Sequence, residues 1–137
     1  IAQELLGSEE EEFTTGVFSD GGSVSTITFR RSLGMGGLSR EVVLETNPLI
    51  QELAESLARA TGLRGCVNIQ SRKVGDSFVP FEINPRISST VTFRKKFGFD
   101  DTRWWIDSLE GKQHSYPNKF KSGYAFRYLT EVYLRME

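Results

Sequence analysis

The sequence is poor in the residues that disulfides and zinc sites require. Its 137 residues include a single cysteine, Cys66, and a single histidine, His114. One cysteine excludes a disulfide within the chain, and the two residues together are too few for a Cys/His zinc site. A reducing, cytoplasmic location fits this composition best.

The chain also lacks an excess of one charge and any long apolar run. Seventeen Lys and Arg residues against eighteen Asp and Glu give a formal net charge of −1. No global field therefore favours nucleic acid or an anionic membrane. No apolar run approaches the length of a membrane span. We expect a soluble intracellular protein with neither nucleic-acid nor membrane partners.

What is present is typical of one folded domain, with 38% hydrophobic and 26% charged residues. We treat residues 1–137 as a single unit in which residues 112–137 form a C-terminal extension. The first residue is Ile1, and residues 2–6 read as the end of an element that has already begun. We therefore expect a fragment of a longer polypeptide.

Hydrophobic periodicity and turn residues predict an α+β fold with a mainly antiparallel sheet and helices packed on one face. Strands are expected at residues 13–20, 23–30, 41–46, 67–74, 78–84 and 124–133. Asn47 and Pro48 predict the N-cap and first position of a helix that ends at Gly62. Further helices are expected at residues 88–97 and 101–109. Residues 32–39 contain three glycines and predict an irregular loop.

A polar triplet, Glu82, Asn84 and Arg86, ends the predicted strand 78–84. Residues two apart in an extended chain share a face, so Glu82 and Asn84 should project together, opposite to Phe81 and Ile83. Such a triplet can hold a magnesium–phosphate group.

The register of the preceding hairpin decides which residues join the triplet. A three-residue turn at residues 75–77 would pair residue 74 with residue 78. It would place Gln70 opposite Glu82 and Asn68 opposite Asn84. A two-residue turn would mix the apolar and polar faces, so the apolar pattern favours the first register.

Gln70, Glu82 and Asn84 would offer hard oxygen ligands, which suit Mg²⁺ or Mn²⁺ and not zinc or copper. This set is sparse, so the metal would need waters and nucleotide phosphate oxygens to complete its shell. Arg86, beyond the strand end, could contact a phosphoryl oxygen through two hydrogen bonds. The same residues fit equally well a polar strand face that points to solvent.

These segments resemble a known family. Residues 65–70, a hairpin and residues 81–86 resemble the distal half of the ATP-grasp fold, especially the branch of the carbamoyl-phosphate synthase large subunit. The resemblance implies that Gln70, Glu82 and Asn84 bind the magnesium ions that bridge ATP phosphates, and that Arg86 assists phosphoryl transfer. Residues 3–7 resemble the hinge strand that holds adenine, and residues 12–20 resemble the segment whose first Glu binds ribose. The cofactor-binding residues implied in this way are Gln3, Glu4, Leu6 and Glu12.

The function implied by the resemblance is that of a C-terminal ATP-grasp subdomain of an ATP-dependent ligase. The parent would bind Mg-ATP and activate a small carboxylate as an acyl phosphate for attack by an amine or ammonia. The chain would supply one wall of the cleft, need the rest of the parent polypeptide and be inactive alone. The alternative is a non-catalytic α+β protein-binding module that uses exposed polar strands and the aromatic C-terminal stretch.

Four other residues carry interpretations that the structure can test. Arg30 and Arg31 are better read as one surface and one structural arginine than as a pair that binds an acidic substrate. Arg94 belongs to a basic cluster on a predicted helix and is expected on a solvated face. Cys66 is expected to be a small core residue.

Overall fold

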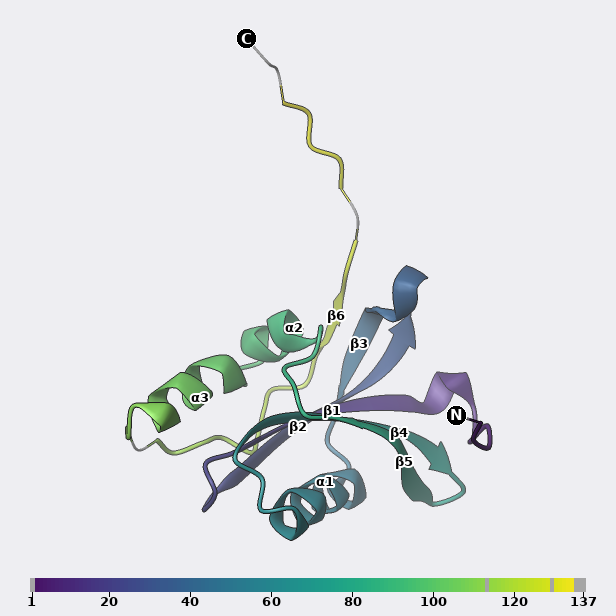
Figure 1. The fold of residues 1–137 in the computed structure, drawn as a ribbon. Coiled ribbons are helices and arrows are strands. Elements are labelled where there is room, and N and C mark those ends of the chain that lie inside the picture. The colour runs from purple at the N-terminus through teal and green to yellow at the C-terminus, as the bar shows by residue number, and fades with distance from the viewer. Residues whose placement is uncertain (1, 113, 129, 135–137) are drawn as a thin grey trace.

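The computed structural model describes residues 2–112, 114–128 and 130–134. It contains a six-stranded sheet in the order β5-β4-β1-β2-β3-β6, in which all neighbours are antiparallel (Figure 1). The strands are β1 Glu12–Ser19, β2 Val24–Leu33, β3 Ser39–Glu45, β4 Gly65–Val74, β5 Ser77–Asn84 and β6 Tyr124–Phe126. The helices are α1 Pro48–Ala60, α2 Val91–Lys96 and α3 Asp101–Leu109, with short 3-10 turns η1 Glu9–Glu11 and η2 Met35–Gly37.

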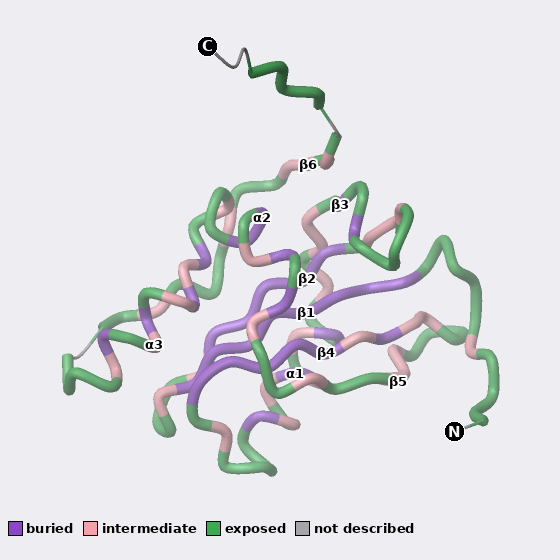
Figure 2. The backbone as a smooth tube through the Cα atoms, turned by 45° about the horizontal axis from the view of Figure 1, so that its top comes forward, coloured by how far each residue is buried: buried purple, intermediate pink, exposed green. Residues whose placement is uncertain are grey.

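The α+β class and the antiparallel sheet are confirmed, but helices lie on both faces of the sheet (Figure 1). Val17 faces α1, where it packs in one apolar cluster with Ala54 and Ala58. Its neighbour Phe18 faces the other way, into a second cluster with Trp104 of α3. All eight residues of β1 are buried, and a strand buried on both sides needs cover on both sides (Figure 2). The expectation of helices on one face is therefore wrong.

Most predicted elements form close to their expected limits. The Asn47 side chain caps α1, because its Oδ1 accepts a hydrogen bond from the Leu49 amide at 2.9 Å. Strand β2 continues to Leu33, three residues beyond its predicted end. The predicted irregular loop at 32–39 is consequently shorter, and η2 occupies most of it.

The expected helix at 88–97 begins only at Val91, because the residues before it bind a buried arginine. Arg94 Nη1 donates to Ser88 Oγ and to Thr90 Oγ1, each at 2.7 Å. Arg94 Nη2 also forms an ion pair with Asp101 Oδ2 at 2.6 Å, and Arg94 is only 1% exposed. The solvated position expected for Arg94 is thus wrong, because α2 turns this side chain inward against the sheet.

The C-terminal strand is much shorter than residues 124–133. Among the described residues of this stretch, only Tyr124, Ala125 and Phe126 pair, with β3. Residue 129, within the predicted strand, lies outside the described residues, as do Ile1 and residues 135–137. Residues 130–134 are exposed and extend away from the sheet (Figure 1). Within the described residues no helix is both long and apolar enough to cross a membrane.

Candidate functional site

The site begins with a bulge in β5. The turn between β4 and β5 has two residues, so Val74 pairs with Ser77 and not with residue 78 as predicted. The register then shifts between Gln70 and Ser71, which pairs with Pro80. This bulge restores the predicted pairing beyond it, in which Gln70 lies opposite Glu82 and Asn68 lies opposite Asn84.

The bulge also changes the direction of Phe81. Alternation alone predicts that Phe81 points away from Glu82, and that prediction is wrong. The guanidinium carbon Cζ of Arg72 lies 5.6 Å from the centre of the Phe81 ring. A bulge places two successive side chains toward the same side of a sheet. Phe81 therefore joins the polar face instead of packing under α1.

The residues predicted to bind metal do lie together. Asn84 Nδ2 donates to Glu82 Oε1 at 2.7 Å, and Gln70 pairs directly with Glu82 across the strands. Glu82 is exposed, and the other two are half-buried. Gln70 Oε1 accepts a hydrogen bond from Arg31 Nη2 at 2.6 Å. The predicted cluster is formed, but one of its oxygens already has a cationic partner.

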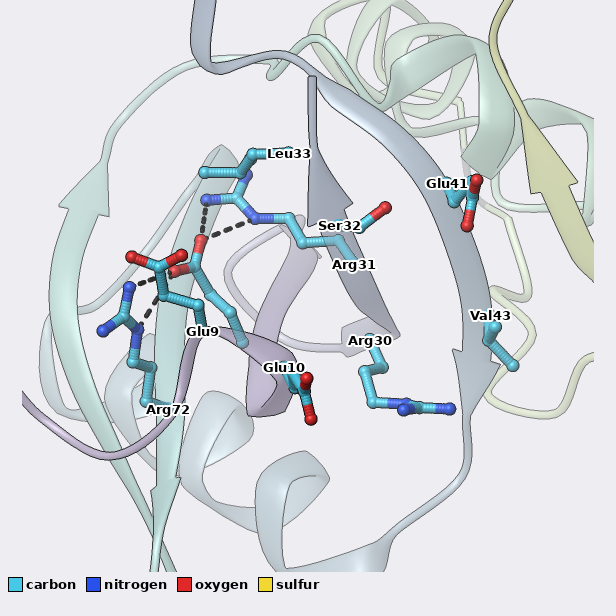
Figure 3. A pocket seen from close by; sticks show the side chains of 10 residues that line it. Glu9, Glu10, Arg30, Arg31, Ser32, Leu33, Glu41, Val43 and Arg72 are labelled. Atoms are coloured by element: carbon cyan, nitrogen blue, oxygen red, sulfur yellow. Dashed lines mark hydrogen bonds and ion pairs between the residues drawn. The ribbon is translucent and has the colours of Figure 1, made fainter. Parts of the chain in front are cut away.

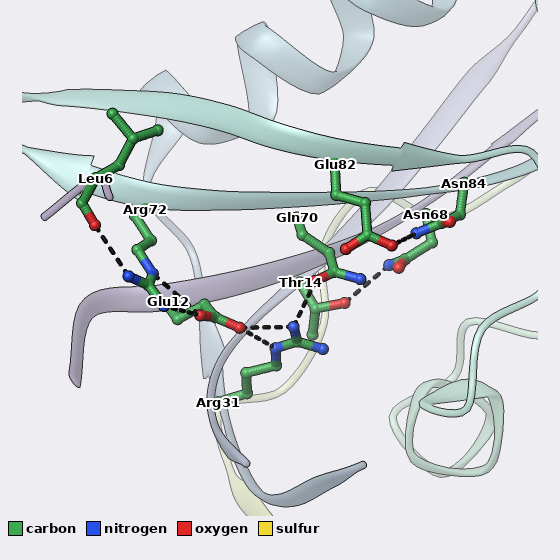
Figure 4. A network of polar contacts seen from close by, with 9 residues as sticks. All are labelled: Leu6, Glu12, Thr14, Arg31, Asn68, Gln70, Arg72, Glu82 and Asn84. Atoms are coloured by element: carbon green, nitrogen blue, oxygen red, sulfur yellow. Dashed lines mark hydrogen bonds and ion pairs between the residues drawn. The ribbon is translucent and has the colours of Figure 1, made fainter. Parts of the chain in front are cut away.

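Glu12 is the centre of a buried ionic network (Figure 4). Arg31 binds its Oε1 through Nε at 3.0 Å and Nη2 at 2.6 Å. Arg72 binds its Oε2 through Nε at 3.0 Å and Nη2 at 2.8 Å. The three side chains are only 5%, 8% and 13% exposed for Glu12, Arg31 and Arg72. Arg31 is thus the structural arginine and Arg30 the exposed one, as expected.

The same network reaches the predicted hinge. Arg72 Nη1 donates to the Leu6 carbonyl oxygen at 3.0 Å. A cavity of about 130 Å³ lies here, and its lining is Gln3, Glu4, Leu5, Leu6, Arg72 and Phe81. All three predicted hinge residues therefore line one cavity, here called the hinge cavity, and Phe81 lines it as well.

A second, larger cavity of about 560 Å³ adjoins Glu12 (Figure 3). It lies between η1 and the ends of β2 and β3, and Arg72 lines both cavities. Its charged lining residues are Glu9, Glu10, Glu12, Arg30, Arg31, Glu41 and Arg72.

Sequence reasoning missed Arg31 and Arg72 as members of the site. One available signal was alternation in β4, since Arg72 is two residues from Gln70 and must share its face. Arg31 gave no comparable signal. Its approach to Glu12 depends on the pairing of β1 with β2, which also sets Phe13 opposite Arg30.

The donor chemistry fits a magnesium ion that also binds phosphate. Among the described residues, no three His, Cys, Asp or Glu side chains cluster as a metal site. Glu82 Oε2 and the amide oxygen of Asn84 take no part in the hydrogen bond between them. Hard oxygens of this kind suit Mg²⁺ when waters and nucleotide oxygens supply the remaining ligands. Arg86 is exposed just beyond Asn84.

Comparison with known families decides the family of this chain. The family model described as "ATP-grasp in the biosynthetic pathway with Ter operon" matches residues 1–132. The chain belongs to the ATP-grasp family. The predicted hinge, the Glu12 segment and the bulged hairpin all lie within the matched range. A comparison with curated protein sequences finds no match.

Solved ATP-grasp structures share the fold at low sequence identity. A biotin carboxylase–βγ-ATP complex from Campylobacter jejuni matches with a TM-score of 0.70 and 16% identity, over 89% of this chain and 30% of that one. The phosphoribosylaminoimidazole carboxylase ATPase subunit from Aquifex aeolicus gives 0.70 and 14%, over 90% and 42%. The ADP complex of N5-carboxyaminoimidazole ribonucleotide synthetase gives 0.68 and 17%, over 84% and 33%. The chain therefore spans less than half the length of each.

Proposed function

We propose that this chain is the Mg-ATP-binding half of an ATP-grasp ligase. The observation that carries the proposal is the bulged hairpin, which turns Phe81 toward the hinge cavity while keeping Glu82 and Asn84 side by side. One strand end thereby offers an apolar ring for a base and oxygen ligands for a metal. The family match and neighbours solved with βγ-ATP and ADP support this function.

Successive segments of the chain would contact successive parts of the nucleotide. Gln3, Glu4 and Leu6 would hold adenine against the Phe81 ring, which lines the same cavity. Glu12 would accept hydrogen bonds from the ribose hydroxyls. Arg72 would fix the adenine-binding segment relative to the ribose-binding Glu12, because it binds both Glu12 and the Leu6 carbonyl oxygen.

The phosphate end would lie over the end of β5. Glu82 and Asn84 would hold Mg²⁺, whereas the oxygen of Gln70, the third predicted ligand, accepts a hydrogen bond from Arg31. Bound Mg²⁺ would neutralise phosphate charge during transfer. Arg86 would hold the transferring phosphoryl group through two hydrogen bonds.

The parent enzyme would phosphorylate a small carboxylate and let an amine or ammonia displace phosphate from the acyl phosphate. The other wall of the cleft would come from the rest of the parent polypeptide, in the cytoplasm. The Gln70, Glu82, Asn84 and Arg86 spacing favours a carbamoyl-phosphate-synthase-like branch. Residues 87–90 differ from the Val-Ser-Arg-Ser-Ser of that branch, so a relative with another substrate also fits.

Nucleotide binding by paired variants tests the proposal. Phe81→Ala removes the ring at the hinge cavity, whereas Phe78→Ala removes a ring that packs edge-on against Phe13, 5.1 Å between centres. We expect Phe81→Ala to weaken Mg-ADP binding by about tenfold and Phe78→Ala to leave it unchanged, measured by calorimetry. Equal effects would contradict the hinge assignment.

A protein-binding module is the second candidate. It is favoured by the exposed aromatic residues at the C-terminal end, since Tyr124, Phe126 and Tyr128 are 75%, 60% and 73% exposed. Such a module should ignore both ADP and Mg²⁺. Failure of the wild-type chain, and of any longer polypeptide that contains it, to bind Mg-ADP would favour this function.

A further inference from the structure

Gln70 holds its only metal-binding atom against a cation. A guanidinium can only donate hydrogen bonds, so the Gln70 atom 2.6 Å from Arg31 Nη2 must be the carbonyl oxygen Oε1. The remaining polar atom of the side chain is the amide nitrogen, which does not bind Mg²⁺. In this arrangement the one Gln70 atom that could bind a metal already accepts a hydrogen bond from a guanidinium.

Arg31 is held firmly in that position. Its Nε and Nη2 both bind Glu12 Oε1, and its side chain is only 8% exposed. Glu12 in turn binds Arg72 through its other oxygen. Arg31 therefore stays beside Gln70 whichever way the Gln70 side chain turns, because leaving a buried carboxylate would be costly.

The charges in this network also oppose a second cation. Two guanidinium groups share one carboxylate, so Arg31, Arg72 and Glu12 carry a formal net charge of +1. A divalent ion on Gln70 Oε1 would share that oxygen with the guanidinium of Arg31. Like charges repel strongly at such separations in a partly buried site.

The other two predicted metal ligands, Glu82 and Asn84, keep oxygen atoms that Arg31 does not bind. Asn84 Nδ2 donates to Glu82 Oε1, which orients the Asn84 amide and leaves its own oxygen and Glu82 Oε2 for a metal. In the described part of the chain, neither Glu82 nor Asn84 forms a hydrogen bond with Arg31.

We infer that the chain binds one divalent ion with its nucleotide, at Glu82 and Asn84, and that the Arg31 guanidinium supplies the positive charge beside Gln70 that a second ion would otherwise supply. The inference rests on the proposed function and narrows it. Arg31 acts as a positioning residue, since it keeps Gln70 away from the metal while it fixes Glu12.

Counting metal per bound nucleotide tests this directly. The purified chain, and any longer polypeptide that contains it, is dialysed to equilibrium against Mn²⁺ and ADP, and both are measured on the protein side. We expect one Mn²⁺ for each ADP retained. Gln70→Ala should leave the Mn²⁺ dissociation constant within about threefold of wild type, whereas Glu82→Gln should raise it about tenfold or more.

A matched pair of arginine variants tests the role of Arg31. Arg31→Met frees the Gln70 oxygen, so it should admit a second Mn²⁺ per ADP. Arg30→Met removes the same charge one residue away, from an exposed side chain that forms none of the hydrogen bonds described for Glu12 and Gln70, and should keep one. Circular dichroism checks that each variant is folded. If Arg31→Met does not fold, the Gln70→Ala comparison decides by itself.

The outcomes separate the inference from the proposed function. Two Mn²⁺ per ADP in the wild-type chain, or equal losses in Gln70→Ala and Glu82→Gln, would overturn the inference and leave nucleotide binding intact. Retention of ADP with no Mn²⁺ at Glu82 would overturn the metal site and the inference with it. Retention of neither, by the chain and by any longer polypeptide that contains it, would overturn both the inference and the proposed function.

Discussion

The side chain of Arg94 lies directly against the backbone of Gly16 in β1. A Cβ atom added at Gly16 would come within 2.5 Å of Arg94 Cδ and 2.8 Å of its Nε. Arg94 cannot simply move aside, because it is buried and paired with Asp101. Glycine in the middle of this strand is therefore a packing requirement.

Gly16→Ala should lower the free energy of unfolding by about 1–3 kcal/mol through overpacking. Urea denaturation measures the loss. Gly22→Ala is the matched control, since the nearest atom to its added Cβ would be Asp20 Oδ1 at 3.6 Å. If both variants are as stable as wild type, Arg94 has more room than its contacts indicate.

Two adjacent aspartates should differ sharply in their contribution to stability. Asp101 pairs with Arg94 at 2.6 Å, with side chains 1% and 2% exposed. Asp101→Asn leaves a buried guanidinium without its charge partner and should cost about 3–5 kcal/mol. Asp100 pairs with exposed Lys95 at 3.3 Å, so Asp100→Asn should cost less than about 1 kcal/mol. Similar losses in thermal or urea unfolding would refute the distinction.

Cys66 should be unreactive in the folded protein. It is 4% exposed, and burial, with a smaller effect of nearby Asp101, raises the pKa of its thiol from 9.0 to about 12. Because only the thiolate is nucleophilic, we expect no reaction with a thiol reagent at about pH 8 until urea unfolds the chain. Rapid modification without denaturant would show that this part of the core opens readily.

The same pKa shift predicts a loss of stability in alkali. A raised pKa in the folded state means that folding favours the protonated thiol, so the stabilisation is complete below the ordinary pKa of 9.0 and is lost as pH rises toward about 12. The stability difference between wild type and Cys66→Ala should therefore shift against wild type as pH rises above 9.0. A difference independent of pH would contradict it.

Arg86→Lys tests the phosphoryl contact proposed for the intact enzyme. An ammonium keeps the charge but cannot reproduce two parallel hydrogen bonds, so turnover should fall about tenfold or more. Arg59→Lys is the control, because Arg59 is an exposed arginine of α1 whose ion pair within the described part of the chain is with Glu55. Turnover equal to wild type in both variants would remove Arg86 from the reaction.

Local patterns in the sequence predicted the ends of α1 and the pairing of Gln70 with Glu82. The pairing is correct although the turn is not. A bulge adds one residue within one strand, and a longer turn adds one residue between the two strands. Either change therefore brings Gln70 opposite Glu82. The two registers differ between the turn and the bulge, where residues 71–74 each pair one residue earlier in β5 than predicted, and at Phe81, whose direction depends on where the extra residue lies. Sequence alternation cannot locate it.

The sequence by itself determined the local patterns on which the candidate site rests, because the proposed hinge, the acidic strand start and the polar strand end are each contiguous in the chain. Only the tertiary structure decided how they connect. Glu12, Arg31 and Arg72 come together because β1 lies between β2 and β4 in the sheet. Strand order depends on which apolar faces α1, α2 and α3 cover, and that is settled by packing over the whole domain and not by neighbours in the chain.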